Sequence, residues 1–408
     1  MANNTALHRK KLSKPSLTSP LRRRRKQPHR RRRTQPQQTL TVHLPFDLVA
    51  EILCRLSVKQ LTQLRCVCKS WNSLISEDYN FAKKHLRLST SCQGRHHLIL
   101  KSTQYLKSKQ LFHLQCPIST IFISKDATMS RYSLDKEGKS TGGYVSTCDG
   151  ILCCKIDSSS ALLFNPSIRN RKFMILPSLK FPDQSFVKIT YTLVYDRFIN
   201  KYKVIALNSS FPKMEVNVHI LGTDYWRRIQ DFPITNVFLL GTEEGIFVSD
   251  SVNWLVSNFV VSLDLEKESY QKFSLPASNV KLITSMHVTL GTLRGCLSFL
   301  FSGECLADVW IMKEFGNEKS WTKLLTVPYF KAWGLCRLNK VLYISEDDQV
   351  LMEIYMAKKK LGITVPTYRV VVYDSINNTY KFPEFQNKIH DDDDMVPEVY
   401  VESLISPF

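Results

Sequence analysis

Several cysteine and aspartate residues stand close enough in the sequence to suggest metal binding. Cys66-x-Cys68 and Cys153-Cys154 offer thiolate ligands, and Asp391–Asp394 is a run of four carboxylates. A structural zinc site needs four ligands at characteristic spacing, and no second CxxC pair or His-x-x-x-His run completes one. Consecutive like charges are typical of a solvated loop. We therefore expect no metal site and no cofactor.

No catalytic motif accompanies these residues. The chain lacks the GxxxxGK[ST] and GxGxxG phosphate loops, the GxSxG nucleophile elbow and the HExxH motif. Cys154 and Cys296 are conceivable nucleophiles, but no residue near either in the sequence marks an activating base. Eleven cysteines without regular spacing in a long chain are typical of reduced, mostly buried thiols. We expect a protein that is not an enzyme.

Residues 44–88 are predicted to form short helices with more apolar surface than so small a unit can bury. Apolar residues at helical spacing follow Pro45, which favours the start of a helix. Ser57 and Gln60 form a capping-box pattern, so a second helix should begin at Val58, and Trp71 should lie in a third. The surplus apolar side chains either pack on the rest of the chain or dock the helices of a partner.

The motif LPxDLxxEILxRL, followed by KxLxxLRCVCKSWxxLI, occupies residues 44–75. It resembles the F-box of plant substrate adaptors for cullin-type ubiquitin ligases, with Ser57 where many relatives have proline. The resemblance implies that this segment binds a Skp-type adaptor protein and, through it, a cullin scaffold. It places at that interface Leu44, Pro45, Leu48, Ile52, Leu53 and Leu56, with Leu61, Leu64, Val67 and Trp71 partly in the core and partly in contact.

From about residue 95 onward, short alternating and β-branched runs predict strands, among them Ile118–Ile123, Tyr191–Tyr195 and Lys203–Leu207. Five segments share a strand, a polar turn, an aromatic-centred strand and a final proline, and these prolines lie 43–56 residues apart. That spacing is close to the roughly 50-residue period of kelch-type propeller blades. A plain β-sandwich with similar hairpins is the alternative. The aromatic residues, predicted to pack one unit on the next, are Phe173, Trp226, Tyr270, Trp321 and Tyr380.

The same stretch resembles the F-box-associated domain of plant F-box proteins. The pieces that carry the resemblance include CDGILCC, LFNPSIRNRKFMILP, LVYDRFINKYKVI and VSLDLEKESYQKFSLP. It departs from true kelch repeats, since their diglycine occurs once here, at Gly142-Gly143. The expected fold is α+β: a small N-terminal helical F-box, then a large all-β, propeller-like domain of about five to six irregular blades. The expected boundaries are 1–41 for a disordered basic tail, 42–88 for the F-box, 89–388 for the β domain, and 389–408 for an acidic loop and C-terminal tail.

The positive charge of the chain is concentrated at its N-terminus. Residues 1–46 hold 13 of the 56 basic residues and no acidic one, so the remainder is only mildly basic. This proline- and arginine-rich stretch buries too little apolar area to order itself. A nuclear import signal, an organelle transit peptide and an inert extension are the competing interpretations, and the clustering favours import. The residues of that signal would be Arg22, Arg23, Arg24, Arg25, Lys26, Arg30, Arg31, Arg32 and Arg33.

These observations favour an interaction protein in the nucleus or cytoplasm. No apolar run reaches the roughly 18 residues that span a bilayer, and the N-terminus lacks a secretory signal. The F-box resemblance implies an adaptor that brings an unidentified protein substrate to the ligase for ubiquitination. The alternative is a nucleic-acid or chromatin-associated protein that acts through the arginine tail, although nucleic acid is the less expected partner.

Overall fold

Four helices come first in the part of the chain that the structure describes. This computed structural model describes residues 44–102, 112–133, 145–157, 159–168, 173–179, 189–208, 214–234, 244–257, 259–276, 287–303, 305–328, 336–360, 363–386 and 395–408. The helices are α1 (Phe46–Leu53), α2 (Val58–Leu64), α3 (Lys69–Glu77) and α4 (Tyr79–Thr90). The capping box is present, since the Gln60 N–H donates to the Ser57 side chain and the Ser57 N–H donates to the Gln60 side chain. The predicted start of α2 at Val58 is therefore confirmed.

The remaining chain forms six four-stranded antiparallel sheets, which we number as blades. Blade 1 is β5 (Val145–Cys148), β6 (Ile151–Lys155), β7 (Ala161–Phe164) and β8 (Met174–Ile175), and blade 2 is β9 (Ile189–Asp196), β10 (Lys201–Asn208), β11 (Glu215–Ile220) and β12 (Arg227–Arg228). Blade 3 is β13 (Ile246–Val248), β14 (Ser251–Val256), β15 (Phe259–Asp264) and β16 (Tyr270–Ser274). Blade 4 is β17 (His287–Leu293), β18 (Cys296–Ser302), β19 (Leu306–Met312) and β20 (Trp321–Pro328). Blade 5 is β21 (Cys336–Ile344), β22 (Gln349–Lys360), β23 (Ile363–Asp374) and β24 (Thr379–Lys381).

Blade 6 is built from both ends of the β region. Its strand order is β26 (Met395–Val401), β1 (His96–Ser102), β2 (Phe112–Pro117) and β4 (Ser130–Ser133). The pairing of β26 with β1 runs from His96 opposite Val401 to Ser102 opposite Met395. Residues 395–408 therefore belong to the fold, which corrects the prediction of a C-terminal tail over 389–408. The aspartate run at 391–394 lies outside the described residues.

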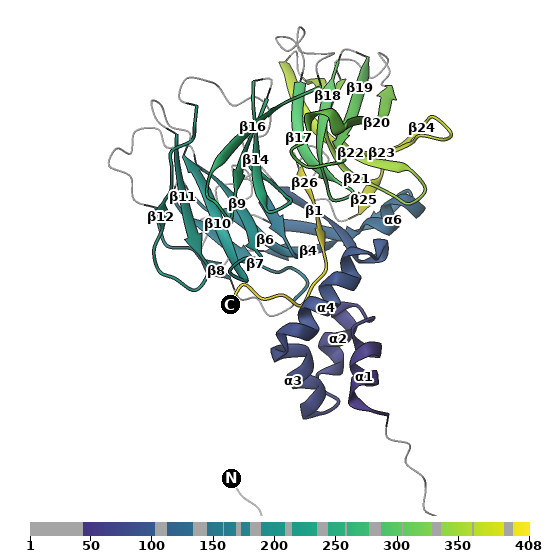
Figure 1. Cartoon of the computed structure of the whole chain (residues 1–408). Coiled ribbons are helices and arrows are strands. Elements are labelled where there is room, and N and C mark those ends of the chain that lie inside the picture. Colours follow the sequence, from purple (N-terminus) through teal and green to yellow (C-terminus); the bar gives the residue numbers. More distant parts are fainter. Residues whose placement is uncertain are drawn as a thin grey trace, which may run out of the picture. The chain divides into compact units, whose positions relative to one another are not determined.

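The innermost strand of each blade lies beside the innermost strand of the next blade, and the six strands together form a closed ring. Contacts join β5 to β9, β9 to β13, β13 to β17, β17 to β21, β21 to β26, and β26 back to β5. Sheets that meet along their inner strands in this way form a six-bladed β-propeller (Figure 1). The expected fold class is confirmed. The blade count, which the sequence left at five to six, is six.

The five repeated segments with a final proline are the outer hairpins of blades 1 to 5, where strands three and four pair. Three of their aromatic residues connect neighbouring blades by donating to a backbone carbonyl of the blade before. These hydrogen bonds join Trp226 Nε1 to Pro177 O (2.7 Å), Tyr270 Oη to Gln230 O (3.0 Å) and Trp321 Nε1 to Ser274 O (3.1 Å). Phe173 packs on Phe164, and Tyr380 packs on Tyr373 of its own blade.

One predicted strand is a helix. Ile118–Ile123 forms α6, although its isoleucines favour strands. Ile118 and Ile121, one helical turn apart, are both fully buried beside β1 and β2, while Ile123 is exposed. Burial of this stripe outweighs the local β preference. The minor elements are η1 (Gln93–Arg95), η3 (Glu318–Ser320) and the parallel pair β3 (Asp126–Thr128) with β25 (Glu384–Gln386).

No helix among the described residues has the length and apolar character needed to cross a bilayer.

Candidate functional site

Helices α1 to α4 pack around a small apolar core of their own. Its buried members come from all four helices and the turn after α1: Leu53, Cys54, Leu61, Leu74, Ile75 and Phe81. Val49 and Trp71 are partly buried against the same cluster. The sequence pattern of apolar residues at helical spacing therefore does build a core.

Polar contacts fix the start of α4 and join this helix to α1 and to the turn that follows α1. Asp78 caps α4, since its Oδ1 accepts the Phe81 N–H at 2.8 Å. Glu51 of α1 pairs with Lys84 of α4, and that hydrogen bond lowers the pKa of the Glu51 carboxyl. His85 is fully buried, with Nε2 2.9 Å from the carbonyl oxygen of Leu56. Burial lowers the pKa of His85 to about 4, so at neutral pH a neutral ring can donate to that carbonyl.

The structure divides the ten predicted interface residues into three groups. The exposed group is Leu44, Pro45, Leu48, Ile52 and Val67. The half-buried group is Leu56, Leu64 and Trp71. Leu53 and Leu61 are buried, at 2% and 0% exposure. The prediction that Leu53 lies at the interface is therefore wrong. Leu61 was expected to lie partly in the core and partly in contact, and the structure places it in the core.

The periodicity of α1 explains the difference between Ile52 and its neighbour Leu53. Leu48 and Ile52 are four residues apart and form one ridge on the helix, and Ile52 is 54% exposed. Val49 and Leu53 form the next ridge, which turns toward the core. A step of 100° along a helix separates an exposed side chain from a buried one, and periodicity alone does not say which ridge faces outward.

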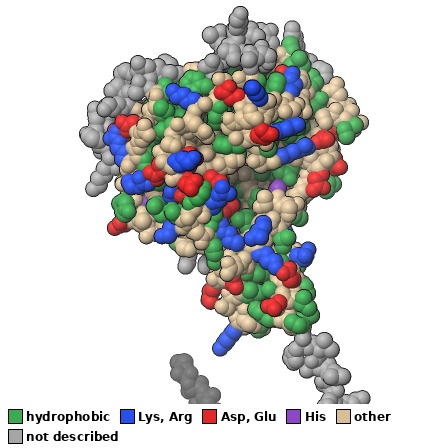
Figure 2. All heavy atoms as spheres, in the orientation of Figure 1, with side chains coloured by type: hydrophobic (Ala, Val, Ile, Leu, Met, Phe, Trp, Pro, Cys, Tyr) green, Lys and Arg blue, Asp and Glu red, His purple; other side chains and the backbone are tan. Residues whose placement is uncertain are grey.

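Phe46 is an exposed apolar residue that the sequence prediction omitted. It is the first residue of α1, and helical spacing groups it with Val49 and Ala50, which are partly buried. Helical spacing therefore predicts a buried position for Phe46. We define the apolar face as the exposed set Phe46, Leu48, Ile52 and Val67. Hydrophobic side chains are visible over the helical region in Figure 2.

Apolar side chains left in water can dock another polypeptide. Burying apolar area contributes roughly 25 cal/mol per Å², so several large side chains covered together provide a substantial driving force. Exposed apolar patches bordered by charge are typical of protein interaction sites. Asp47 of α1 and Lys59 of α2 are exposed charged residues of the same helical region. The arrangement supports binding rather than catalysis.

The cysteines are less buried than predicted. Among the described residues, five free cysteines are buried, two are intermediate, and Cys66, Cys68 and Cys92 are exposed. A hydrogen bond with the Ser70 hydroxyl lowers the pKa of Cys68. The described residues hold no cluster of three or more His, Cys, Asp or Glu side chains placed to bind a metal.

The propeller has a cavity of about 680 Å³ lined by its inner strands. Lys340 Nζ lies 2.6 Å from Glu398 Oε2 within it. Burial disfavours the Lys340 ammonium, but Glu398 and Glu244 outweigh this and raise its pKa. Burial raises the pKa of nearby Glu353 to about 7, against the opposing hydrogen bond from Asn339. Glu398 and Glu244 thus stabilise the Lys340 charge, and no substrate-binding residue follows from this contact.

The arginines and lysine of the predicted import signal, from Arg22 to Arg33, lie outside the described residues. Their role stays a prediction.

Comparisons with known proteins agree with this geometry. Residues 101–407 match the model of the F-box associated beta propeller domain, and residues 42–83 match that of the F-box domain. The "F-box/kelch-repeat protein At3g23880" of Arabidopsis thaliana is 31% identical over 380 residues, which cover 90% of this chain and 96% of that protein. The "F-box protein CPR1" of the same plant is 25% identical and covers 77% and 80%.

The helices with their exposed apolar face coincide with the F-box match, and the six blades coincide with the propeller match. The chain therefore belongs to the F-box-associated β-propeller family of plant-type F-box proteins.

Proposed function

We propose that this protein is the substrate-recognition adaptor of a cullin-RING (SCF-type) E3 ubiquitin ligase. In this role the apolar face of the F-box binds a Skp-type adaptor protein and, through it, the cullin scaffold. The propeller binds a protein substrate, so ubiquitin transfer to that substrate becomes effectively intramolecular. The protein itself contributes no catalytic group.

The observation that carries this proposal is the exposure of four large apolar side chains, Phe46, Leu48, Ile52 and Val67, on a segment that matches the F-box model. A helical unit that completes its own core would be expected to bury such residues. Amphipathic helices that present an apolar ridge commonly dock in a helix-lined groove. An adaptor protein with an apolar groove fits this ridge.

Replacement of Leu48 and Ile52 by glutamate tests the proposal directly. The double variant should lose binding to a recombinant plant Skp-type adaptor in a pull-down and by calorimetry, since it places two charges in an apolar contact. Thermal unfolding should be unchanged, because both side chains are exposed.

Glutamate at Ile123 and Ile376 makes the matched control, since both isoleucines are exposed but belong to the propeller region. That variant should bind the adaptor as the wild type does. Undiminished adaptor binding by the Leu48→Glu, Ile52→Glu variant would refute the proposed docking face.

The alternative, nucleic-acid binding by the arginine tail, predicts a different response to salt. Contacts to phosphates release counterions, so affinity should fall by orders of magnitude between 50 and 200 mM salt and vanish when residues 1–41 are deleted. Adaptor binding through apolar residues should change little over that range. For localisation, a fluorescent fusion lacking residues 1–40 should leave the nucleus if the tail is an import signal.

A further inference from the structure

The last seven residues of the chain continue past the closing strand β26 and contact both the propeller and the F-box. We name residues 402–408 the strap. Glu402, Ser403, Ile405 and Pro407 are buried. Leu404 is partly buried, whereas Ser406 and Phe408 are exposed. The buried residues have partners on two sides.

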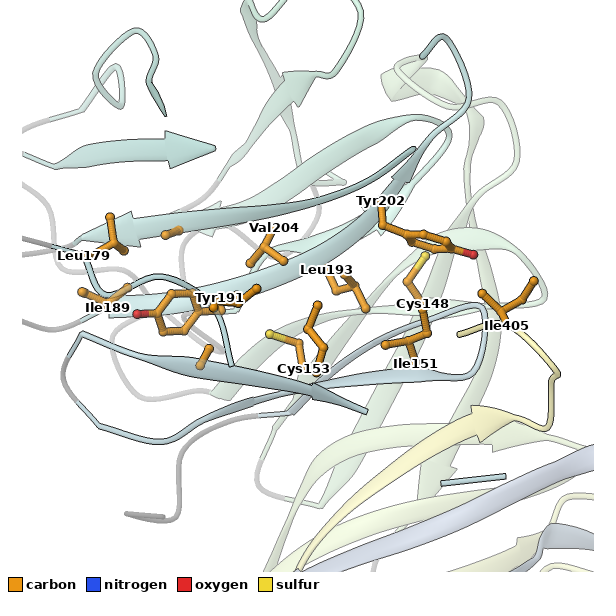
Figure 3. Close-up of a cluster of buried hydrophobic side chains, with 14 of the residues drawn as sticks. Cys148, Ile151, Cys153, Leu179, Ile189, Tyr191, Leu193, Tyr202, Val204 and Ile405 are labelled. Carbon is orange, nitrogen blue, oxygen red and sulfur yellow. The ribbon is translucent and has the colours of Figure 1, made fainter. Parts of the chain in front are cut away.

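On the propeller side, the strap binds blade 1 through Asn165. Its side-chain Nδ2 lies 3.0 Å from Ser403 O, 3.1 Å from Ser403 Oγ and 2.8 Å from Ile405 O. Ser403 Oγ in turn donates to the carbonyl of Asp149 at 2.6 Å. Figure 3 shows Ile405 entering the apolar cluster between blades 1 and 2, beside Ile151 and Cys148.

On the F-box side, Glu402 faces the buried Arg95, which lies in the link between α4 and β1 and contacts the F-box. Arg95 Nε lies 3.7 Å from Glu402 Oε1, and its Nη1 donates to Ser89 Oγ at 3.0 Å and lies 3.4 Å from Cys54 O. Burial raises the pKa of Glu402, while the Arg95 charge and the Val58 backbone N–H oppose that rise. Leu404 packs against both the F-box core and the blade 1–2 cluster.

A second contact converges on the same turn of blade 1. Lys83 of α4 lies 3.5 Å from Asp149 Oδ2, with its Nζ 3.3 Å from the ring centre of Tyr195. Tyr202 Oη donates to Asp149 Oδ2 at 2.7 Å. A charge held between a carboxylate and an aromatic face has a well-defined position.

The close approach at this turn requires a glycine. Gly150 has φ +82°, and a Cβ there would lie 2.5 Å from both Ser403 Oγ and Val401 O. The turn of blade 1 is therefore shaped to accept the chain end as well as to connect β5 with β6.

From these contacts we propose that the strap is a positioning element that holds the F-box in one orientation relative to the propeller. Without it, the chain connects the two regions covalently only once, through residues 91–95 between α4 and β1. The strap adds a buried non-covalent connection, beside the contact of Lys83 in α4 with Asp149 in blade 1. This inference rests on the proposed function for its consequence: a substrate on the propeller would be presented to the ligase from a constant direction.

The test measures the distance between the two regions in the full chain. Fluorophores are attached through non-natural amino acids at Lys59 of α2 and Lys313 after β19, both exposed, and single-molecule energy transfer reports the distance distribution. We expect one narrow population in the wild type. Deletion of residues 402–408, which leaves β26 intact, should widen it at least twofold.

Asn165→Asp is the more precise variant. It keeps the Oδ1 atom that accepts the Ser167 N–H at 2.8 Å, but it replaces the donor to the strap by an acceptor. It should widen the distribution as the deletion does.

The matched control is Asn253→Asp, which changes a buried asparagine that donates within blade 3. It should lower the unfolding temperature without widening the distance distribution.

A narrow distance distribution after deletion of the strap, a broad one in the wild type, or equal widening by Asn253→Asp would each overturn the proposal.

Binding to the Skp-type adaptor is measured on the same proteins. We expect binding by the wild type and by both strap variants, since the apolar face lies elsewhere. If the wild-type protein does not bind the adaptor, the proposed function is refuted, whereas the measured distance distributions still test the role of the strap.

Discussion

The F-box and the propeller use the same kinds of apolar residue in opposite ways. In the propeller, each blade has a neighbour on both sides, and large side chains such as Trp254 are buried between sheets, at 1% exposure. In the F-box, four short helices bury one ridge of α1 and leave Leu48 and Ile52 in water. A closed ring of sheets completes its own core, whereas a small helical unit leaves surface for a partner.

The largest expected effect separates a core residue from a face residue within the F-box. Leu61→Ala should lower the free energy of unfolding of the F-box by about 2–5 kcal/mol, because it leaves a cavity at a fully buried site. Ile52→Ala should change it by less than about 0.5 kcal/mol, since that side chain is exposed. Chemical denaturation followed by circular dichroism in the helical band measures both. Similar losses in the two variants would contradict the assignment of these residues to core and face.

Val67 tests how far the docking face extends. It follows α2 and is 59% exposed. Val67→Glu should weaken binding of the Skp-type adaptor roughly 10- to 100-fold, an ordinary effect for an interface residue, without altering the unfolding temperature. Calorimetric titration gives the affinity, with Ile376→Glu as a control outside the face. Full affinity in Val67→Glu would restrict the face to α1.

The F-box should lose stability in mild acid through its buried histidine. Burial lowers the pKa of His85 from 6.5 to about 4. Between these two pH values, the unfolded chain therefore binds a proton at His85 that the folded chain does not bind. The contribution of neutral His85 to the free energy of unfolding is fully present above pH 6.5 and should decline as the pH falls toward 4. His97, whose pKa burial also lowers to about 4, acts in the same direction. Urea midpoints at pH 7.5 and 5.0 should differ less in His85→Gln than in the wild type, and an undiminished difference would contradict the role of His85.

The smallest expected effect concerns the contact between blades 3 and 4. Trp321→Phe removes the N–H that donates to Ser274 O, which should lower the free energy of unfolding by about 1–2 kcal/mol. Trp310→Phe is the matched control, because Trp310 Nε1 has no hydrogen-bond partner in the part of the chain that the structure describes. Equal losses in both variants would mean that ring packing, and not the hydrogen bond, joins these blades.

Much of the fold could be predicted from local sequence. The capping box at Ser57 predicted the start of α2, since both of its partners lie within one helical turn. The five repeats ending in proline predicted five outer hairpins, because turn residues and strand-ending prolines act over a few positions. The F-box motif predicted exposed residues at Leu48 and Ile52, but it also placed the buried Leu53 among them.

The sequence by itself determined the short helices, the hairpins and the family, because spacing, caps and turns act between near neighbours in the chain. Only the tertiary structure decided the sixth blade and the strap, since β26 pairs with β1 about 300 residues away and Asn165 meets Ser403 across 238 residues. It also made Ile118–Ile123 a helix and turned Leu53 inward. Burial against distant elements decides such cases, and no local pattern records which neighbours will be there.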